Sequence, residues 1–296
     1  MSTVIFRLAQ RTEQDADAFC ELSNSLYARK VFPAYYDWQF FQCPHAPFLM
    51  MGWRDARLVA AYGVHVVAGP GPSRAMSLDI MISGSEQGKG LISDLAGTAM
   101  DEAKRRGAIV LSVVGNLRAR DALGKRLGWS AWSIVSDWTS ETTGPDHLPV
   151  SIVARPPARN FAASTRTFYP RDDASLAWRT SGPRYKYQWL AIGEPASPAG
   201  WAAVKAFLDP VTGKGFGDIL GVFRSGNTAL ELLLSSIQNW FAAQGIGSAA
   251  MTPAGTDEEA VLTRLGFEPS TRHRYFCGLG SRPDDIAIGM LDIDVY

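Results

Sequence analysis

The chain repeats itself at a spacing of 138 to 140 residues. Trp38 and Trp178 lie 140 residues apart, and the tripeptide at 127–129 (Leu-Gly-Trp) recurs at 265–267 as Leu-Gly-Phe. Two further pairs keep the same order and nearly the same spacing: Pro44 with Pro183, and Gly107 with Gly245. A period this long indicates a duplicated domain rather than an array of short repeats.

The boundary between the two copies is predicted where proline and glycine cluster. Such clusters mark turns and linkers, because both residues interrupt regular structure. The cluster consists of Gly144, Pro145, Pro149, Pro156 and Pro157. We therefore expect a first domain over residues 1–145 and a second over 146–296.

Within each copy, the hydrophobic spacing alternates between the period of a strand and that of a helix. A helix capped by Thr12 is expected between the first two strands, because threonine at a helix start accepts a hydrogen bond from the first turn. The first half predicts strands at 4–8, 48–53, 57–67, 75–82, 109–114 and 131–138, with later helices near 92–103 and 118–127. The second half predicts strands at 186–192, 201–207, 216–223, 248–252 and 268–276, with helices at 230–241 and 256–265.

The segment from Leu78 to Ile92 reads as a strand, a glycine-bearing loop and a helix start, and this arrangement favours an anion. The first turn of a helix carries unpaired N–H groups and the positive end of the helix dipole. Gly88 and Gly90 would let a phosphate approach the backbone closely, and Lys89 adds a cation. The spacing matches neither a P-loop nor a Rossmann fingerprint.

Here the sequence resembles the GNAT superfamily of acetyltransferases, from about residue 4 to 138 and again, more faintly, from about 150 to 277. That family places a Gln/Arg-x-x-Gly-x-Gly/Ala motif after its fourth strand, where backbone amides hold the pyrophosphate of coenzyme A. The Gln87-Gly88-Lys89-Gly90 run matches the first part, whereas Ile92 stands where the family prefers glycine or alanine. The resemblance implies an α/β fold with two tandem GNAT domains, each a mixed, mostly antiparallel sheet flanked by helices.

The resemblance also implies a set of residues that bind acetyl-CoA or another acyl-CoA. Asn116, the short helix after it and the Leu-Gly-Trp tripeptide fit the family's pattern after its fifth strand. The cofactor-binding residues expected from this match are Ile82, Gln87, Gly88, Lys89, Gly90, Leu91, Ile92 and Asn116. The second copy has Ser225-Gly226-Asn227-Thr228 instead, without the lysine and the second glycine, so we expect one cofactor site, in the first copy.

Asp79 is the predicted catalytic residue, because the family often carries an acidic residue on its fourth strand to receive the proton of the amine. The family's tyrosine falls near Leu123 or Gly124 here, and neither can donate a proton to the leaving thiolate. The region between the first helix and the second strand commonly lines the acceptor pocket in GNAT proteins. Its Tyr36, Asp37 and His45 are the predicted substrate-binding residues, whereas the repeated Trp38 is expected to be structural.

Three functions follow as hypotheses. The first is transfer of an acetyl or short acyl group from acyl-CoA to a primary amine of a small molecule. The Trp–Pro element of both halves and the closing Leu291-Asp292-Ile293-Asp294 resemble tandem GNAT proteins of bacterial surface-polysaccharide pathways, some of which acylate nucleotide-linked amino sugars. The second is a non-catalytic module that binds acyl-CoA or a partner protein. The third is a Fem-type aminoacyl transferase, although such enzymes carry long helical insertions that this chain lacks.

Composition limits the partners and the compartment. The 29 basic and 29 acidic side chains cancel, whereas a nucleic-acid binder usually carries a basic excess. The three cysteines are widely spaced and predict neither a disulfide framework nor a zinc site. With no signal peptide and no run of about 18 apolar residues, we expect a cytoplasmic protein with no metal, nucleic-acid or membrane partner.

Overall fold

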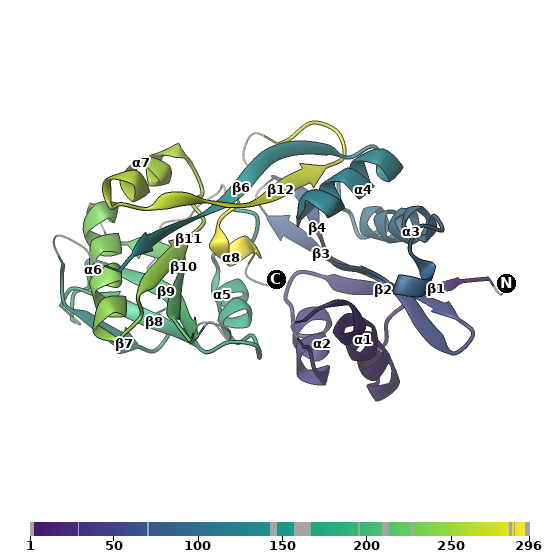
Figure 1. Cartoon of the computed structure of the whole chain (residues 1–296), viewed down its shortest axis with the longest axis horizontal. Coiled ribbons are helices and arrows are strands. Elements are labelled where there is room, and N and C mark those ends of the chain that lie inside the picture. The colour runs from purple at the N-terminus through teal and green to yellow at the C-terminus, as the bar shows by residue number, and fades with distance from the viewer. Residues whose placement is uncertain are drawn as a thin grey trace. The chain divides into compact units, whose positions relative to one another are not determined.

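The structure is a computed structural model of the chain that divides into two compact units (Figure 1). Unit 1 comprises Met1–Ile134 and Arg274–Pro283, and unit 2 comprises Val135–His273 and Asp284–Tyr296. The predicted boundary was at residue 145. In the structure, unit 2 begins earlier, at Val135, and the later segment Arg274–Pro283 belongs to unit 1. The structure describes residues 3–28, 30–69, 71–142, 147–156, 167–194, 196–208, 213–225, 228–283, 286 and 288–293.

Unit 1 is built on a mostly antiparallel sheet in which β4 and β5 form the parallel pair. The antiparallel strands β2 and β3 are joined by the short Asp55-Ala56 turn. The strand order is β1-β2-β3-β4-β5-β12. The bounds are β1 Ile5–Leu8, β2 Pro47–Arg54, β3 Arg57–Gly69, β4 Gly71–Ile82, β5 Val110–Gly115 and β12 Glu268–Gly278.

Helices cover both faces of this sheet, with α1 and α2 on one face and α3 and α4 on the other (Figure 1). The start of α1 is fixed by Thr12, whose side chain accepts a hydrogen bond from the Asp15 N–H, as predicted. The apolar side of α3, with Leu95, Ala96 and Ala99, packs against β2, β3 and β4. The bounds are α1 Glu13–Leu26, α2 Pro33–Phe40, α3 Leu91–Arg105 and α4 Leu117–Leu127.

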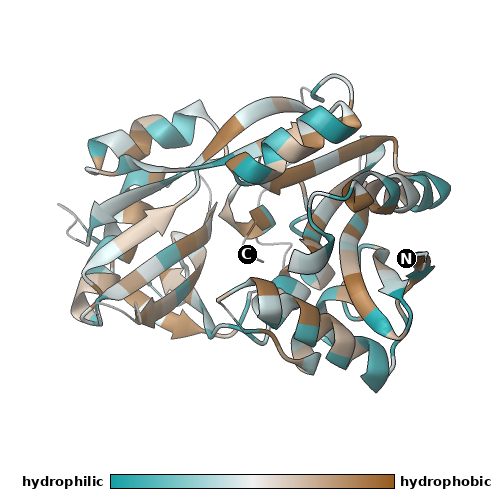
Figure 2. Cartoon of the chain, turned by 45° about the vertical axis from the view of Figure 1, so that its right-hand side comes forward, coloured by the Kyte–Doolittle hydropathy of each residue, from teal (hydrophilic) through white to brown (hydrophobic). Residues whose placement is uncertain are grey.

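Unit 2 follows the same plan, with β10 and β11 as its parallel pair in the strand order β6-β11-β10-β9-β8-β7. Helix α6 covers one face through Leu233, Leu234, Ile237 and Phe241. Hydrophobic residues predominate along the central strands of both units (Figure 2). The bounds are β6 Ser130–Glu141, β7 Val150–Val153, α5 Asp173–Thr180, β8 Tyr187–Ile192, β9 Gly200–Leu208, β10 Gly215–Arg224, α6 Leu230–Ala243, β11 Ser248–Met251, α7 Thr256–Arg264 and α8 Met290–Ile293.

The last long strand of each half completes the sheet of the other unit. The chain passes from unit 1 to unit 2 within β6, whose later residues, Trp138 to Glu141, pair antiparallel with β11. It passes back within β12, whose final residues, Tyr275 to Gly278, pair antiparallel with β5. Each unit therefore contains sequence from both halves of the chain.

A Gly278→Ala substitution is expected to destabilise unit 1, because a Cβ at this position would overlap the ring of Trp132. The ring would have to move, and overpacking of this kind costs about 1–3 kcal/mol. Gly84→Ala is the matched control, because a Cβ at Gly84 meets no atom within 4 Å. Thermal unfolding of the full chain measures both, and equal melting temperatures would contradict the packing seen at β12.

The C-terminal helix α8 is held in unit 2 by the buried carboxylate of Asp292. Its Oδ1 accepts hydrogen bonds from the Tyr169 N–H at 3.0 Å and from Arg171 at 3.1 Å, and its Oδ2 accepts from the Gly289 N–H at 2.9 Å. A second bond from Arg171 to Oδ2, at 3.1 Å, makes the ion pair bidentate. Helix α8 also packs on β10, where a Cβ at Gly221 would lie 2.8 Å from Leu291.

Each unit contains a short helix, α2 in unit 1 and α5 in unit 2, that the hydrophobic spacing does not predict. Helix α2 is buried on most sides, through Tyr35, Tyr36, Trp38 and Phe40 among others, so its sequence shows no single apolar stripe. Trp38 and its repeat Trp178 are both buried, as expected for structural residues. Among the described residues, no helix is long and apolar enough to cross a membrane.

Candidate functional site

Strands β4 and β5 are paired only along the first part of β4. Their parallel register runs from Arg74 opposite Val110 to Ser77 opposite Val113. Within the described residues, the last part of β4, Leu78 to Ile82, has no strand partner on the β5 side. A strand edge of this kind leaves N–H and C=O groups that an extended ligand can bind.

A β-bulge interrupts β4 where the two strands part. Ala61 of β3 pairs with Met81 and Gly63 pairs with Leu78, so Asp79 and Ile80 together face one residue of β3. Asp79 has a φ of 45°, in the left-handed region that aspartate tolerates better than most residues do. The bulge turns the predicted catalytic carboxylate away from the regular alternation of the strand.

Two tyrosines of the α1–α2 region lie at this bulge. The buried Tyr35 hydroxyl donates a hydrogen bond to Asp79 Oδ2 at 3.1 Å, and the 48% exposed Tyr27 donates to the Ile80 carbonyl at 3.3 Å. Burial and the nearby charge of Asp79 raise the pKa of the Tyr27 phenol. Neither tyrosine belonged to the predicted site, although the predicted residues Tyr36, Asp37 and His45 come from the same region, because the sequence does not show which side chains of that region reach β4.

The predicted anion loop lies between the end of β4 and the start of α3. Gly88 and Gly90 have φ values of 80° and 84°, which only glycine adopts without strain, and Gly90 is the N-cap of α3. The side chain of Gln87 closes the loop by donating to the Ile82 carbonyl at 3.0 Å. Lys89 lies 3.5 Å from Glu86, which also pairs with Arg54.

This loop has the features of a phosphate cradle. A Cβ added at Gly88 or Gly90 would meet no atom within 4 Å, so space is open beside the backbone. The first N–H groups of α3, at Leu91 and Ile92, have no partner one turn earlier within the helix, because they start it. Together with the helix dipole and the 46% exposed Lys89 side chain, they favour a diphosphate.

Asn116 begins α4, and its Oδ1 accepts a hydrogen bond from the Ala119 N–H at 2.9 Å. The side chain therefore caps the helix in this structure, and its predicted contact with the cofactor stays a prediction. Leu123, near the position of the family's tyrosine, is buried in the core of unit 1.

The predicted substrate-binding residues have partners inside unit 1. Tyr36 is buried against Phe19 and donates to the Gln10 carbonyl at 2.6 Å. Asp37 forms an ion pair with Arg11 at 2.6 Å, and His45 is 6% exposed. The structure brings Tyr35 into contact with Asp79, and the role of Tyr36, Asp37 and His45 toward a substrate stays a prediction.

Buried His65 is part of a small polar group in the core. Its Nε2 lies 3.1 Å from the Gln39 carbonyl oxygen, which can only accept, so Nε2 carries the proton. Its Nδ1 lies 3.7 Å from the Cys43 sulfur. Because His65 is fully buried, we assign this pair a structural role.

Unit 2 has a bulge at the corresponding strand but a different occupant beside it. The register of β10 with β9 shifts between Ile219 and Gly221, just where the pairing of β10 with β11 ends. Helix α8 contacts β10 there through Leu291, and Met290 contacts Thr252 at the end of β11. Gly226 and Asn227, in the loop compared with 87–90, lie outside the described residues.

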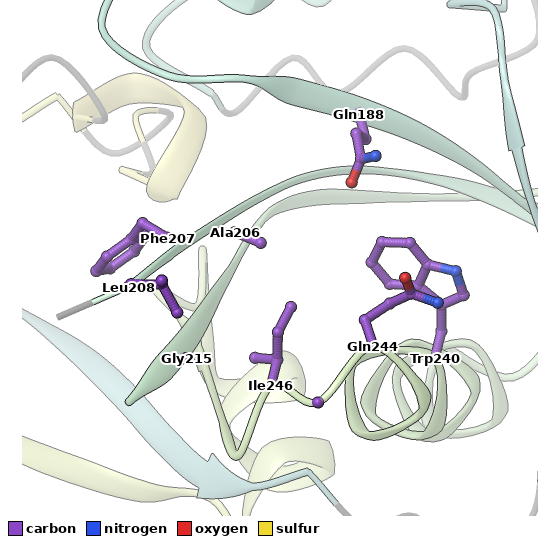
Figure 3. A pocket seen from close by; sticks show the side chains of 9 residues that line it. Gln188, Ala206, Phe207, Leu208, Gly215, Trp240, Gln244 and Ile246 are labelled. Atoms are coloured by element: carbon purple, nitrogen blue, oxygen red, sulfur yellow. The ribbon is translucent and has the colours of Figure 1, made fainter. Parts of the chain in front are cut away.

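A pocket of about 300 Å³ is present in unit 2, at the end of α6 (Figure 3). Trp240 of α6, Gln244 directly after α6 and Gln188 of β8 border it, and the rest of its lining is Ala206, Phe207, Leu208, Gly215, Gly245 and Ile246. None of these residues is a titratable acid or base, so the pocket supplies no group for proton transfer. In the described residues, no group of three or more His, Cys, Asp or Glu side chains is placed to hold a metal ion.

Comparisons with known proteins agree with this geometry. Residues 16–129 match the model of the acetyltransferase (GNAT) family, and this segment contains most of α1, the β4 bulge and the whole loop of 87–92. No curated protein sequence matches the chain.

Solved structures show the same fold at low sequence identity. A tandem GNAT protein from the clavulanic acid biosynthesis pathway is 15% identical, with 95% of this chain and 100% of that chain covered and a TM-score of 0.62. A GCN5-related N-acetyltransferase from Anabaena variabilis is 12% identical, with 92% and 72% covered and a TM-score of 0.66. The N-myristoyltransferase of Saccharomyces cerevisiae, solved with bound myristoyl-CoA, is 8% identical, with 96% and 84% covered and a TM-score of 0.67.

The family match over residues 16–129, the parted β4 and β5 strands and the glycine loop at the start of α3 lead to one assignment: unit 1 of this chain contains an acetyltransferase domain of the GNAT family.

Proposed function

We propose that this protein transfers an acetyl or short acyl group from acyl-CoA to a primary amine of a small molecule, with an amino sugar as the first acceptor to test. The observation that carries the proposal is the combination in unit 1 of an open glycine loop at a helix start with a carboxylate at a strand bulge. The glycine loop suits a diphosphate, and the carboxylate suits an ammonium group.

In the proposed site, the loop of 87–92 holds the diphosphate of the acyl-CoA through backbone N–H groups and Lys89. The part of β4 from Leu78 to Ile82, which has no pairing with β5, receives the extended arm that carries the thioester. Positioning of this kind brings the thioester carbon and the amine together and supplies much of the rate.

Asp79 holds the acceptor nitrogen and takes its proton in this scheme. The nitrogen forms a bond to the acyl carbon while the carbon–sulfur bond breaks, and the nitrogen becomes acidic as its lone pair is used. Its proton passes to the Asp79 carboxylate, and the thiolate of coenzyme A leaves with the electron pair of the broken bond. Water supplies the proton of the thiolate, since Leu123 cannot.

Unit 2 is proposed to be a degenerate copy of the same fold, produced by duplication. Its support is the repeat at 138 to 140 residues and the recurring order of strands and helices. Helix α8, rather than an open strand edge, lies beside its bulge. We therefore assign one acyl-CoA site per chain, in unit 1.

The activity is tested by following free thiol with acetyl-CoA and a panel of primary amines that includes amino sugars. Release of thiol that depends on both the enzyme and one amine, with an N-acetylated product in the mass spectrum, supports the proposal. Binding of acetyl-CoA without product from any amine would indicate a binding module instead.

A Lys89→Glu variant is expected to bind coenzyme A at least about 10-fold more weakly, because it replaces an attractive charge at the diphosphate with a repulsive one. Lys125→Glu, which makes the same change on the exposed surface of α4, is the control. Calorimetric titration with coenzyme A measures both. If Lys89→Glu binds coenzyme A as tightly as the wild type does, the loop of 87–92 is not part of the coenzyme A site.

A further inference from the structure

The proposed site leaves open what fixes the carboxylate of Asp79 in place. Asp79 lies on a bulge rather than in a regular ladder, so its direction depends on side-chain contacts as well as on the strand. Tyr35 on α2 supplies such a contact, with its hydroxyl 3.1 Å from Asp79 Oδ2. We infer that Tyr35 is a positioning residue that holds the Asp79 carboxylate toward the acceptor amine, an inference that rests on the proposed function.

The rigidity of Tyr35 supports this role. Its side chain is 1% exposed and packs against Phe19 of α1 and Trp38 of α2, with ring centroids 6.3 and 5.8 Å away. A buried phenol packed against two aromatic rings is held in one orientation, so the direction in which its hydroxyl donates is fixed. The Tyr35 N–H is held in turn by the Phe32 carbonyl at 2.8 Å, at the start of α2.

The segment that leads into α2 is also tied down. Asn24 of α1 binds Val31 twice, since its amide donates to the Val31 carbonyl at 2.9 Å and its oxygen accepts from the Val31 N–H at 2.7 Å. This clasp fixes the connection between α1, which ends beside Tyr27, and α2, which carries Tyr35.

Two further phenols, those of Tyr27 and Tyr62, lie near the bulge. Tyr27 reaches the bulge from the end of α1 and donates to the Ile80 carbonyl. Tyr62, the residue of β3 opposite the bulge, donates to Ser77 at 3.0 Å instead, and burial raises its pKa to about 12. The hydrogen bond that the Tyr35 hydroxyl donates to Asp79 Oδ2 favours the ionised form of the Asp79 carboxyl group.

The test is a Tyr35→Phe variant, with the titration of the Asp79 carboxyl carbon followed by NMR and assigned with Asp79→Asn. Removal of a donor to a carboxylate favours the protonated form, so the midpoint is expected to move up by about one pH unit. The acidic limb of the kcat/KM profile should move in the same direction, with coenzyme A affinity unchanged.

Tyr36→Phe is the matched control, because Tyr36 is equally buried on the same helix but donates to the Gln10 carbonyl. Both variants lose a buried hydroxyl and are expected to melt at lower temperature. An unchanged Asp79 midpoint in Tyr35→Phe, or an equal shift in Tyr36→Phe, would overturn the inference. The NMR midpoint needs no substrate, so failure of the proposed activity shows separately, as absence of thiol release by the wild-type enzyme.

Discussion

An Asp79→Asn variant is expected to lose a factor of about 10² to 10⁴ in kcat/KM, the range by which a positioned acid or base accelerates a reaction. Asparagine keeps the shape of the side chain and tolerates the left-handed backbone at this bulge. Its amide oxygen still accepts a hydrogen bond from Tyr35. The variant therefore removes the charge and the proton acceptor while it keeps the bulge.

The measurement is steady-state thiol release at several pH values, with calorimetric titration of coenzyme A alongside. Coenzyme A affinity should stay at the wild-type value, because the loop of 87–92 is unchanged. Asp101→Asn on α3 makes the same chemical change at a carboxylate that is 78% exposed, and it serves as the control. A variant Asp79→Asn that keeps more than a third of wild-type kcat/KM would exclude Asp79 as the base.

The second large effect is expected from Asp292→Ala, which should lower the free energy of unfolding of unit 2 by about 3–5 kcal/mol. The Asp292 side chain is fully buried and Arg171 is only 11% exposed, so removal of the carboxylate leaves a guanidinium without its counter-charge. The N–H groups of Tyr169 and Gly289 lose their acceptor as well. Helix α8 is only four residues long, and it depends on these bonds rather than on its own stability.

Urea denaturation of the full chain, followed by tryptophan fluorescence, measures this loss. Asp292→Asn separates the two contributions, because it keeps one acceptor oxygen but not the charge, and an intermediate loss is expected. Glu268→Ala, at an exposed position of β12, is the control and should change stability by less than about 0.5 kcal/mol. An equal midpoint for Asp292→Ala and Glu268→Ala would show that α8 does not anchor unit 2.

The sequence predicts the helices and strands that have a clear hydrophobic period. The predicted helix at 92–103 is α3, observed at Leu91–Arg105, and the predicted strand at 216–223 is β10, observed at Gly215–Arg224. The glycine loop is also predictable, because closely spaced glycines between a strand and a helix favour a turn with positive φ, and Gly88 and Gly90 both have positive φ. These features are local, and local spacing is enough to identify them.

The tertiary structure decided the contacts between segments distant in the sequence. One example is the pairing of β6 with β11 and of β12 with β5. The apolar alternation of a strand does not show which neighbouring strand it pairs with, so the sequence does not predict these pairings. The hydrogen bond between Tyr35 and Asp79 joins residues 44 positions apart, because α2 packs beside the β4 bulge. The hydrogen bond between the Tyr169 N–H and Asp292 joins residues 123 positions apart. Hydrogen bonds of this kind depend on distance in space, which periodicity along the chain does not encode.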